Sequence, residues 1–356
     1  MKFDYDVAIV GLGPAGSTLA RLLDKHFKVV AIDKKRIADG GFKKVCGGLL
    51  SLDAQEALAR FDMTLPKEIL VDPQIFAVKT IDLKAGLTRV YQRPYVNLDR
   101  DKFDKWLMSL VPPHVEIILD GRCESVERDG DGFRLKVVHG GKERVMTAKY
   151  VVGADGASSI VRRCLEGKTK TRRYVAIQQW FREGNAKPFY SCVFDCDTSD
   201  CCSWSISKDG MFIFGGAFPF DDPRGRFEEQ KRKLEKYGFV FGEPIKTEAC
   251  VVLRPRRMSD FRLGSNGEFL IGEAGGFISP SSLEGISYAM NTAQKLAEII
   301  NACSDRRSPN NAYRRAVLPM RIKLMAKVLK CAFMYVPFLR RLVMKSGVQS
   351  LDMFNV

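Results

Sequence analysis

The chain has 356 residues, 46% of them hydrophobic, and its 57 basic and 42 acidic residues give a net charge of +15. This composition is typical of a globular protein with one large core or two moderate ones. No transmembrane run and no signal-peptide pattern is present, so a cytoplasmic protein is predicted. The basic surface suits an anionic cofactor or membrane, and the lack of any nucleic-acid-binding motif argues against nucleic acid as a partner.

The ten cysteines are scattered and include no CxxC pair, which favours free thiols. The tightest group contains Cys192, Cys196, Cys201 and Cys202. Its spacing is not that of a metal site, and no histidine lies near it in the sequence. We therefore expect no metal, with a disulfide or metal in this group as the alternative to plain thiols on strands.

A dinucleotide-binding motif opens the chain. An apolar strand over Tyr5–Val10 precedes a glycine-rich turn, and a helix is predicted over Ser17–Leu23. A second strand over Val29–Ile32 ends in Asp33. The turn reads Gly11-Leu12-Gly13-Pro14-Ala15-Gly16. This order of strand, turn, helix, strand and acid is typical of a site for an adenine dinucleotide.

Each part of this motif has a physical role. Gly11 permits the tight turn, Gly13 lets the backbone approach the phosphates, and Gly16 lets the helix pack close to the sheet. The N-terminus of the helix offers free N–H groups and a partial positive charge to the anion. Asp33 can accept hydrogen bonds from the ribose hydroxyls. The alternative is a glycine turn in an ordinary α/β protein.

The middle of the chain alternates between helical and extended patterns. A helix is predicted over Asp53–Arg60, and residues 74–96 alternate apolar and polar as antiparallel strands do. A further helix is expected over Asn97–Leu110, with Asn97 or Asp99 near its cap. Separate strands are predicted over Val115–Leu119, Phe133–His139, Arg144–Met146 and Tyr150–Val152.

A β-rich block over residues 172–254 follows, interrupted by a helix near Arg226–Tyr237. Its aromatic residues are expected to line a tunnel for an apolar substrate. They are Trp180, Phe181, Phe189, Tyr190, Phe194, Trp204, Phe212, Phe214 and Phe218. A buried strand over Phe269–Glu273, a long helix over Glu284–Asn301 and a helical tail from about residue 312 complete the chain.

This order predicts an α/β fold in which a Rossmann-like nucleotide domain carries an inserted, mostly antiparallel β-sheet domain. The nucleotide domain is expected to be discontinuous, over residues 1–73, 97–168 and 255–305. The β-rich substrate domain is expected over 74–96 and 169–254, and a C-terminal helical segment over 306–356.

Three separated motifs carry a resemblance to a known family. The first is Gly11–Gly16 with Asp33, the second runs from Val152 to Ser159 with Arg162, and the third from Ile271 to Phe277. Together they resemble the FAD-dependent oxidoreductases built like para-hydroxybenzoate hydroxylase. Within that superfamily the chain is most similar to the geranylgeranyl reductase family, and to its CbrA-type branch. The runs that carry this last likeness are Lys44–Leu50, Tyr174–Phe181 and Trp204–Gly210.

The resemblance implies FAD as the cofactor, bound without a covalent link. The residues that it places at the cofactor are Gly11, Gly13, Pro14, Ala15, Gly16, Asp33, Lys34, Cys46, Gly47, Arg100, Asp155, Gly156, Gly272, Glu273, Pro280, Glu284, Gly285 and Ile286. Glu273 stands where the family usually has aspartate, and it could accept hydrogen bonds from the ribityl chain. The helix that begins at Gly285 and Ile286 would direct its amides at the flavin and stabilise the reduced form. Alternatives are a surface charge for Arg100 and a turn-capping acid for Asp155.

No second glycine motif with strand and helix flanks is present, so a dedicated nicotinamide domain is not expected. The electron donor is then NAD(P)H that binds transiently, or a donor of the ferredoxin or quinol type.

Three residues are candidates for catalysis: Cys46, Trp204 and Lys208. In the family that the chain resembles, a Cys-Gly pair in this loop lies near the flavin ring, where a thiol could gate the flavin or donate a proton. Inert packing is the alternative for Cys46. Trp204 and Lys208 match a family pattern, but their companions Cys202, Ile206 and Ser207 do not, so a core strand is the alternative for this segment.

The leading functional hypothesis is a flavoenzyme that reduces carbon–carbon double bonds of an apolar, isoprenoid-type substrate by hydride transfer from reduced flavin. An aromatic hydroxylase of the same fold is the second, and a non-catalytic flavin- and lipid-binding protein is the third. The expected partner is a small apolar substrate such as a prenyl lipid. The tail from Leu318 alternates basic and apolar residues, so it could also contact an anionic membrane peripherally. Packing of its apolar stripe onto the protein is the favoured alternative.

Overall fold

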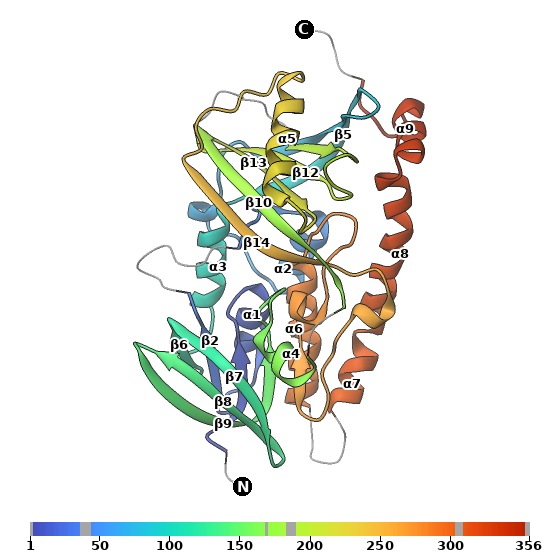
Figure 1. Cartoon of the computed structure of the whole chain (residues 1–356). Helices are drawn as coiled ribbons and strands as arrows, with labels where there is room; N and C mark the ends of the chain where they lie inside the picture. Colours follow the sequence, from blue (N-terminus) through green and yellow to red (C-terminus); the bar gives the residue numbers. More distant parts are fainter. Residues whose placement is uncertain (1–2, 36–43, 168–169, 183–189, 303–308, 353–356) are drawn as a thin grey trace.

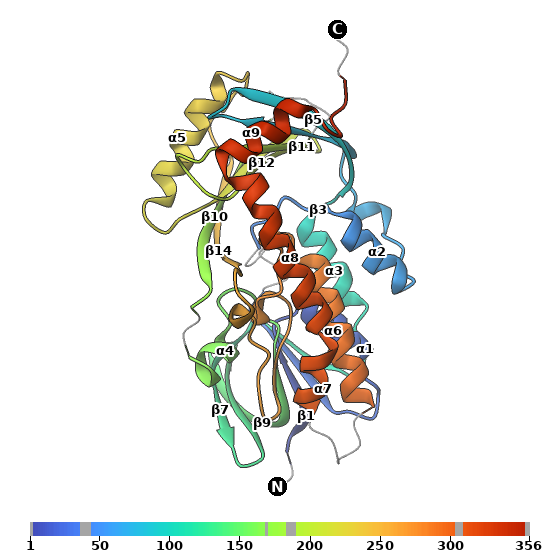
Figure 2. The same ribbon diagram turned by 90° about the vertical axis from the view of Figure 1, so that its right-hand side faces the viewer.

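Two β-sheets lie at opposite ends of an elongated molecule, the first at the lower end of Figure 1 and the second at the upper end. Helices α1 (Pro14–Leu22) and α6 (Ile286–Asn301) lie beside the first sheet. Helix α8 (Leu318–Tyr335) runs along the side of the molecule from one sheet toward the other, as Figure 2 shows. The α/β class with a second, mostly antiparallel sheet and C-terminal helices is confirmed. This computed structural model describes residues 3–35, 44–167, 170–182, 190–302 and 309–352.

The first sheet is the Rossmann-like one. Its strands are β1 (Tyr5–Val10), β2 (Val29–Asp33), β6 (Glu116–Leu119), β7 (Gly121–Asp129), β8 (Gly132–His139), β9 (Lys142–Gly153) and β15 (Glu268–Leu270). The order is β6-β2-β1-β9-β8-β7, and β15 pairs with β9. Strands β6, β2, β1, β9 and β15 pair in parallel, whereas β7, β8 and β9 form an antiparallel meander. The parallel strands therefore end together at one edge, where nucleotides bind in such sheets.

Two strands of this sheet differ from the prediction. Strand β9 is continuous, so the two short strands expected at its ends are one: its first part pairs with β8 and its last part with β1. Strand β7 was not expected, because it is polar and most of its side chains are exposed or half-buried, with Val126 buried. It is stabilised by the ladder to β8 rather than by an apolar face.

The second sheet contains eight strands in the order β14-β10-β13-β12-β11-β4-β5-β3. They are β3 (Leu49–Leu50), β4 (Ile75–Asp82), β5 (Leu87–Asn97), β10 (Arg172–Arg182), β11 (Tyr190–Phe194), β12 (Ser203–Lys208), β13 (Met211–Phe218) and β14 (Lys246–Arg254). All neighbours are antiparallel except β11 and β4. The antiparallel strands expected over 74–96 are confirmed, and they join the block from 172 to 254 through the β4–β11 pair. The domain boundaries themselves stay a prediction.

The remaining helices lie close to where the sequence predicts them. They are α2 (Leu52–Arg60), α3 (Arg100–Ser109), α4 (Ile160–Leu165), α5 (Pro223–Glu235), α7 (Pro309–Ala316) and α9 (Pro337–Ser346), with 3₁₀ turns η1 (Lys67–Ile69), η2 (Met258–Asp260) and η3 (Gly272–Gly275). Helix α1 begins at Pro14 rather than Ser17, because proline is well suited to a first turn.

Three other element boundaries in the structure also differ from the predicted ones. Asp99 caps α3 by accepting hydrogen bonds from Asp101 N and Lys102 N, so the helix begins at Arg100 and Asn97 is not its cap. Helix α6 begins at Ile286 rather than Glu284. The strand predicted to run to Glu273 ends at Leu270, and Glu273 lies in the turn η3.

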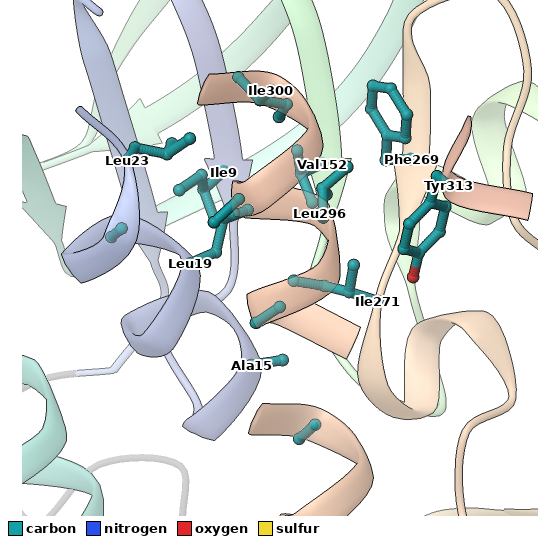
Figure 3. Packing of buried hydrophobic residues seen from close by; sticks show 14 of the residues in the cluster. Ile9, Ala15, Leu19, Leu23, Val152, Phe269, Ile271, Leu296, Ile300 and Tyr313 are labelled. Carbon is teal, nitrogen blue, oxygen red and sulfur yellow. The ribbon is translucent and has the colours of Figure 1, made fainter. Parts of the chain in front are cut away.

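The core beside the first sheet is formed where α1 and α6 pack against each other and against the strands. Figure 3 shows Leu19 of α1 and Leu296 and Ile300 of α6 gathered near Ile9 and Val152. All five side chains are buried. This packing fixes the N-terminal ends of both helices at the edge where the parallel strands end.

The aromatic residues of the second sheet divide between its faces. Phe212, Phe214 and Phe218 of β13 are buried, and the last two pack against Phe227 of α5. Phe181 joins the same cluster. These four predicted tunnel residues therefore form a core beneath α5, and Phe189 lies outside the described residues. Trp204 faces the opposite side, toward the glycine-rich loop near Cys46.

The predicted helical tail is present as α7, α8 and α9. Its inner side is attached to the rest of the protein: Lys327 of α8 pairs with Asp53, and Tyr335 donates a hydrogen bond to Ser281 O at 2.6 Å. Arg340 of α9 pairs with Asp82 of β4. No helix in the described part of the chain is both long and apolar enough to span a bilayer.

The pair between Arg340 and Asp82 yields a first prediction. Arg340 Nε lies 2.7 Å from Asp82 Oδ2, and both side chains are buried. Arg340→Met leaves the carboxylate buried without its charge partner, so we expect the free energy of unfolding to fall by about 3–5 kcal/mol. Chemical denaturation measures the change, with the exposed neighbour variant Arg341→Met as the control. An Arg340→Met loss no larger than that of the control would contradict this role.

Candidate cofactor-binding site

The glycine turn after β1 has the geometry that its sequence predicts. Gly11 has a φ of +100°, and a Cβ there would lie 2.6 Å from Ala154 O. A Cβ on Gly16 would collide with Gly11 O. At Gly13, by contrast, no described atom lies within 4 Å of the Cβ position. Gly13 thus faces open space at the N-terminus of α1, where a pyrophosphate could approach the backbone.

Asp33 holds this turn in place. Its Oδ2 accepts a hydrogen bond from Leu12 N at 2.6 Å, and its Oδ1 accepts one from Lys35 N at 2.8 Å. The carboxylate is buried at the end of β2. A carboxylate has about four acceptor positions, so these two bonds leave capacity for a ribose. Lys34, the next residue, is exposed.

The second motif, from Val152 to Ser159, contacts the first through Ala154, which lies against Gly11. Asp155 Oδ2 accepts a hydrogen bond from Ile160 N at 2.6 Å, as a turn-capping acid does. Its Oδ1 is buried and has no hydrogen-bond partner among the described residues. Burial raises the pKa of Asp155, although hydrogen bonds from Ser159 and Ile160 oppose the shift. Asp155 therefore caps the turn and also keeps one acceptor oxygen free of described partners.

The third motif lies against both. The Cβ position of Gly272 is 3.1 Å from Ala15 Cβ, and that of Gly156 is 3.9 Å from Glu273 Oε2. Glu273 accepts a hydrogen bond from Leu253 N at 2.9 Å and pairs with Lys44 Nζ at 2.6 Å. The three glycine motifs, far apart in the sequence, thus meet at one edge of the first sheet.

The start of α6 forms the next part of the site. Gly285 is its N-cap, and no described side chain caps the helix at that residue. Glu284 accepts hydrogen bonds at 2.8 Å from both Ser287 N and Ser287 Oγ, and burial raises the pKa of Glu284. Ile286 is buried in a cluster with residues of α3. Pro280 O accepts a hydrogen bond from Arg254 Nε at 2.8 Å, which ties this turn to β14.

A cluster of charged side chains includes Arg100, which lies near Cys46. Asp104 Oδ1 accepts a hydrogen bond from Arg100 Nε at 2.9 Å, and Asp104 Oδ2 forms an ion pair with Lys35 Nζ at 3.0 Å. Burial lowers the pKa of Arg100, but Asp104 and the nearby Cys46 sulfur outweigh it and the pKa lies above its usual value. Cys46 Sγ also accepts a hydrogen bond from Gly48 N at 3.4 Å. Arg100 is therefore a paired, largely buried charge near the thiol and not a fully exposed surface charge.

The second sheet contacts the same loop through β12. The Cβ position of Gly47 is 2.6 Å from Ile206 Cδ1 and 3.6 Å from Trp204 Cδ1. Trp204 Nε1 donates a hydrogen bond to Gln178 Oε1 at 3.1 Å. The structure thus brings Trp204 to the loop that contains Cys46.

Lys208 fastens that loop. Its Nζ donates to Asn97 Oδ1 and Leu98 O, both at 2.6 Å, and to Gly48 O at 3.4 Å. Burial lowers the pKa of Lys208 to about 8, and the nearby Cys46 acts in the opposite direction. All three ammonium protons are engaged, so this side chain positions the loop and does not point a free donor into the site.

Four residues that hold the site together are not among the predicted cofactor-binding or catalytic residues. They are Lys35, Lys44, Asp104 and Arg254. Lys44 and Asp104 each stand within four residues of a predicted site residue, Cys46 and Arg100 respectively. An i, i+4 pair on a helix marks Asp104, whereas nothing in the sequence around Arg254 marks it.

The site as a whole fits a flavin dinucleotide. Open space adjoins Gly13, Asp155 presents a buried oxygen without a described partner, and neither N-cap residue of the described helices α1 and α6 supplies a capping side chain, although Glu284 binds Ser287 N. Backbone N–H groups and a carboxylate suit phosphates and hydroxyls respectively. The residues of the three motifs lie at one edge of the first sheet and could hold one elongated ligand.

Comparisons with known proteins agree with this assignment. A family model described as an FAD binding domain matches residues 76–226. The solved structure of a geranylgeranyl bacteriochlorophyll reductase-like protein from Thermoplasma acidophilum is similar, with a TM-score of 0.70 and 21% identity over 98% of this chain and 88% of that one. A probable FAD-dependent monooxygenase from Pseudomonas aeruginosa has a TM-score of 0.71 and 18% identity, covering 97% of this chain and 99% of its own. At these identities the likeness concerns the fold.

A stronger relationship comes from sequence. Protein CbrA of Escherichia coli O6:H1 is 50% identical over 345 residues, which cover 97% of this chain and 94% of that protein. Protein CbrA of Escherichia coli strain K12 is 49% identical over 97% of both chains. FAD is the cofactor, and the protein belongs to the CbrA family within the superfamily of FAD-dependent oxidoreductases and monooxygenases.

Proposed function

We propose that the protein reduces carbon–carbon double bonds in an apolar, isoprenoid-type substrate. The observation that carries the proposal is the surroundings of Cys46: Arg100 and Lys208 both lie near its sulfur, and Trp204 lies beside the next residue, Gly47. The likeness to a geranylgeranyl reductase-like structure supports the same substrate class.

Reduction of an alkene requires a hydride at one carbon and a proton at the other. FAD, when bound and reduced, supplies the hydride. Cys46 holds the proton on Sγ and gives it to the second carbon, and water restores it afterwards. The guanidinium of Arg100 stabilises the thiolate that remains after the transfer.

Other residues of this chain shape the site around that thiol. Trp204 and Ile206 present apolar surface beside Gly47, which suits a hydrocarbon chain and excludes water. Lys208 fixes the loop through its bonds to Gly48 O and Leu98 O. In this proposal Cys46 is the catalytic residue, Trp204 contacts substrate, and Lys208 is a positioning residue.

An aromatic hydroxylase is the second candidate. It is favoured by the fold shared with the probable monooxygenase from Pseudomonas aeruginosa, and by the departure of Cys202, Ile206 and Ser207 from the reductase pattern. Such an enzyme would consume oxygen together with a phenolic substrate, so oxygen uptake separates it from the reductase.

The FAD-loaded protein provides the direct test. The flavin is reduced without oxygen, and geranylgeranyl compounds are then added while the flavin absorbance is followed. We expect the oxidised spectrum to return and the product to gain two hydrogens per double bond by mass spectrometry. Absence of reoxidation with every polyprenyl compound, together with oxygen uptake stimulated by a phenol under NADPH, would replace the reductase by the hydroxylase.

The role of Cys46 gives a second test. Cys46→Ala removes the proton donor, so we expect the reoxidation rate to fall about 10²–10⁴-fold while the bound FAD is retained. Cys164→Ser, which changes an exposed thiol on α4, is the control and should leave the rate unchanged. If the Cys46→Ala protein reoxidises its flavin as fast as the wild type, the thiol of Cys46 has only a packing role.

The ammonium group of Lys208 gives a third test of the proposed function. A neutral amine has two N–H donors for three acceptors, so loss of its proton should release Gly48 O, the longest contact at 3.4 Å. We therefore expect the reoxidation rate to decline as the pH rises through about 8, the pKa of Lys208. Lys208→Met should be slower at low pH and should lose this decline, whereas Lys236→Met on the surface keeps it. The same decline in Lys208→Met would assign it to another group.

A further inference from the structure

The outward face of the last two long helices is apolar. Along α8 the exposed side chains Leu318, Ile322, Leu329 and Phe333 follow at intervals of four, seven and four residues, which places them on one helical face. Phe338 and Leu342, four residues apart, are exposed on the next helix, α9. We call these six residues the outer stripe. Leu329 is 73% and Phe338 67% exposed. A surface helix ordinarily turns polar residues outward, so this arrangement is reversed.

Positive charge accompanies the outer stripe. From Pro309 to Ser346 the sequence contains nine basic residues and no acidic one. Lys330, Arg341 and Lys345 are exposed on the same two helices. Lys323 is also exposed, although it reaches Asp53 Oδ1 at 3.3 Å. An apolar face bordered by basic side chains is the pattern of a helix that lies in the headgroup region of an anionic bilayer.

The opposite side of α8 borders the candidate site. Tyr335 donates to Ser281 O, and Lys327 Nζ lies 5.3 Å from the ring centre of Tyr288 in α6. Arg254, which holds Pro280 O, stacks on Tyr335 at 4.5 Å. One helix therefore has its inner side at the α6 end of the site and its outer side toward solvent, as the foreground of Figure 2 shows.

The positive charge beside the outer stripe indicates which partner covers it, a second copy of the chain or a lipid surface. A second copy of the chain, related by twofold symmetry, would oppose the same basic residues to one another across the contact. An anionic lipid surface satisfies both the apolar stripe and the positive flanks. We propose that the outer stripe docks the protein on anionic membranes, so that α8 and α9 lie in the interface. Resting on the proposed function, this surface would bring a membrane-resident prenyl lipid next to the site.

Sedimentation with vesicles tests the docking with the FAD-loaded protein. Vesicles of phosphatidylcholine alone are compared with vesicles that also contain phosphatidylglycerol, at low and at high salt. We expect binding to the anionic vesicles at low salt, about tenfold or more above binding to neutral ones, and a loss of that excess at high salt.

Two variants separate the apolar and the charged contributions. Leu329→Ser/Phe333→Ser/Phe338→Ser should weaken binding to anionic vesicles about tenfold or more, because it removes most of the inserted surface. Lys330→Gln/Arg341→Gln/Lys345→Gln should weaken it by about fivefold per charge at low salt and should weaken binding to neutral vesicles little. Phe76→Ser/Ile245→Ser changes two exposed apolar residues outside the tail and serves as the matched control.

Several results would overturn the proposal. The docking proposal fails if the wild type does not bind anionic vesicles at low salt. It also fails if the wild type and the stripe variant, Leu329→Ser/Phe333→Ser/Phe338→Ser, bind these vesicles equally. A wild-type dimer that becomes monomeric in the stripe variant would make the face a protein interface instead. Vesicle binding requires no turnover, so docking without any flavin reoxidation refutes the proposed reductase alone. Reduction of a dispersed short polyprenyl compound without vesicle binding refutes the docking alone.

Discussion

The ion pair between Lys44 and Glu273 joins the parts of the chain that make the candidate site. Lys44 Nζ lies 2.6 Å from Glu273 Oε2, although the two residues are 229 positions apart. Burial lowers the pKa of Lys44, but the nearby Glu273 carboxylate outweighs it, so the pKa of Lys44 lies above its usual value. Glu273 also accepts a hydrogen bond from Leu253 N of β14. One carboxylate thereby connects the glycine motifs, the loop before Cys46 and the second sheet.

The alternation of side chains along β12 gives the second sheet two distinct faces. Trp204, Ile206 and Lys208 point to the loop near Cys46, whereas the rings of β13 fill a core beneath α5. Gly215 lies opposite Trp204, and a Cβ there would lie 2.7 Å from the indole. The absence of a side chain at Gly215 therefore gives the indole its place beside the site.

Sequence predicts the local parts of this molecule well and the long-range parts poorly. The turn at Gly11, Gly13 and Gly16 and the acid at Asp33 depend on neighbouring residues, so their pattern is sufficient. Asn97 was one of two candidates for a helix cap, yet it ends β5 and binds Pro73 O, Ser207 O and Lys208 Nζ. Two of these partners lie more than 100 positions away, and no local pattern encodes them. The polar strand β7 escaped notice because backbone pairing, not an apolar face, defines it.

The pairing of Asp82 with Arg340 also bears on how the chain acquires its structure during synthesis. The partners are separated by 258 positions, and β4 further depends on β11 for its parallel neighbour. Contacts of such large separation form late, because the intervening loop must first be closed. Asp82 consequently stays without its cation until almost the whole chain has left the ribosome, and consolidation of the second sheet is a post-translational event.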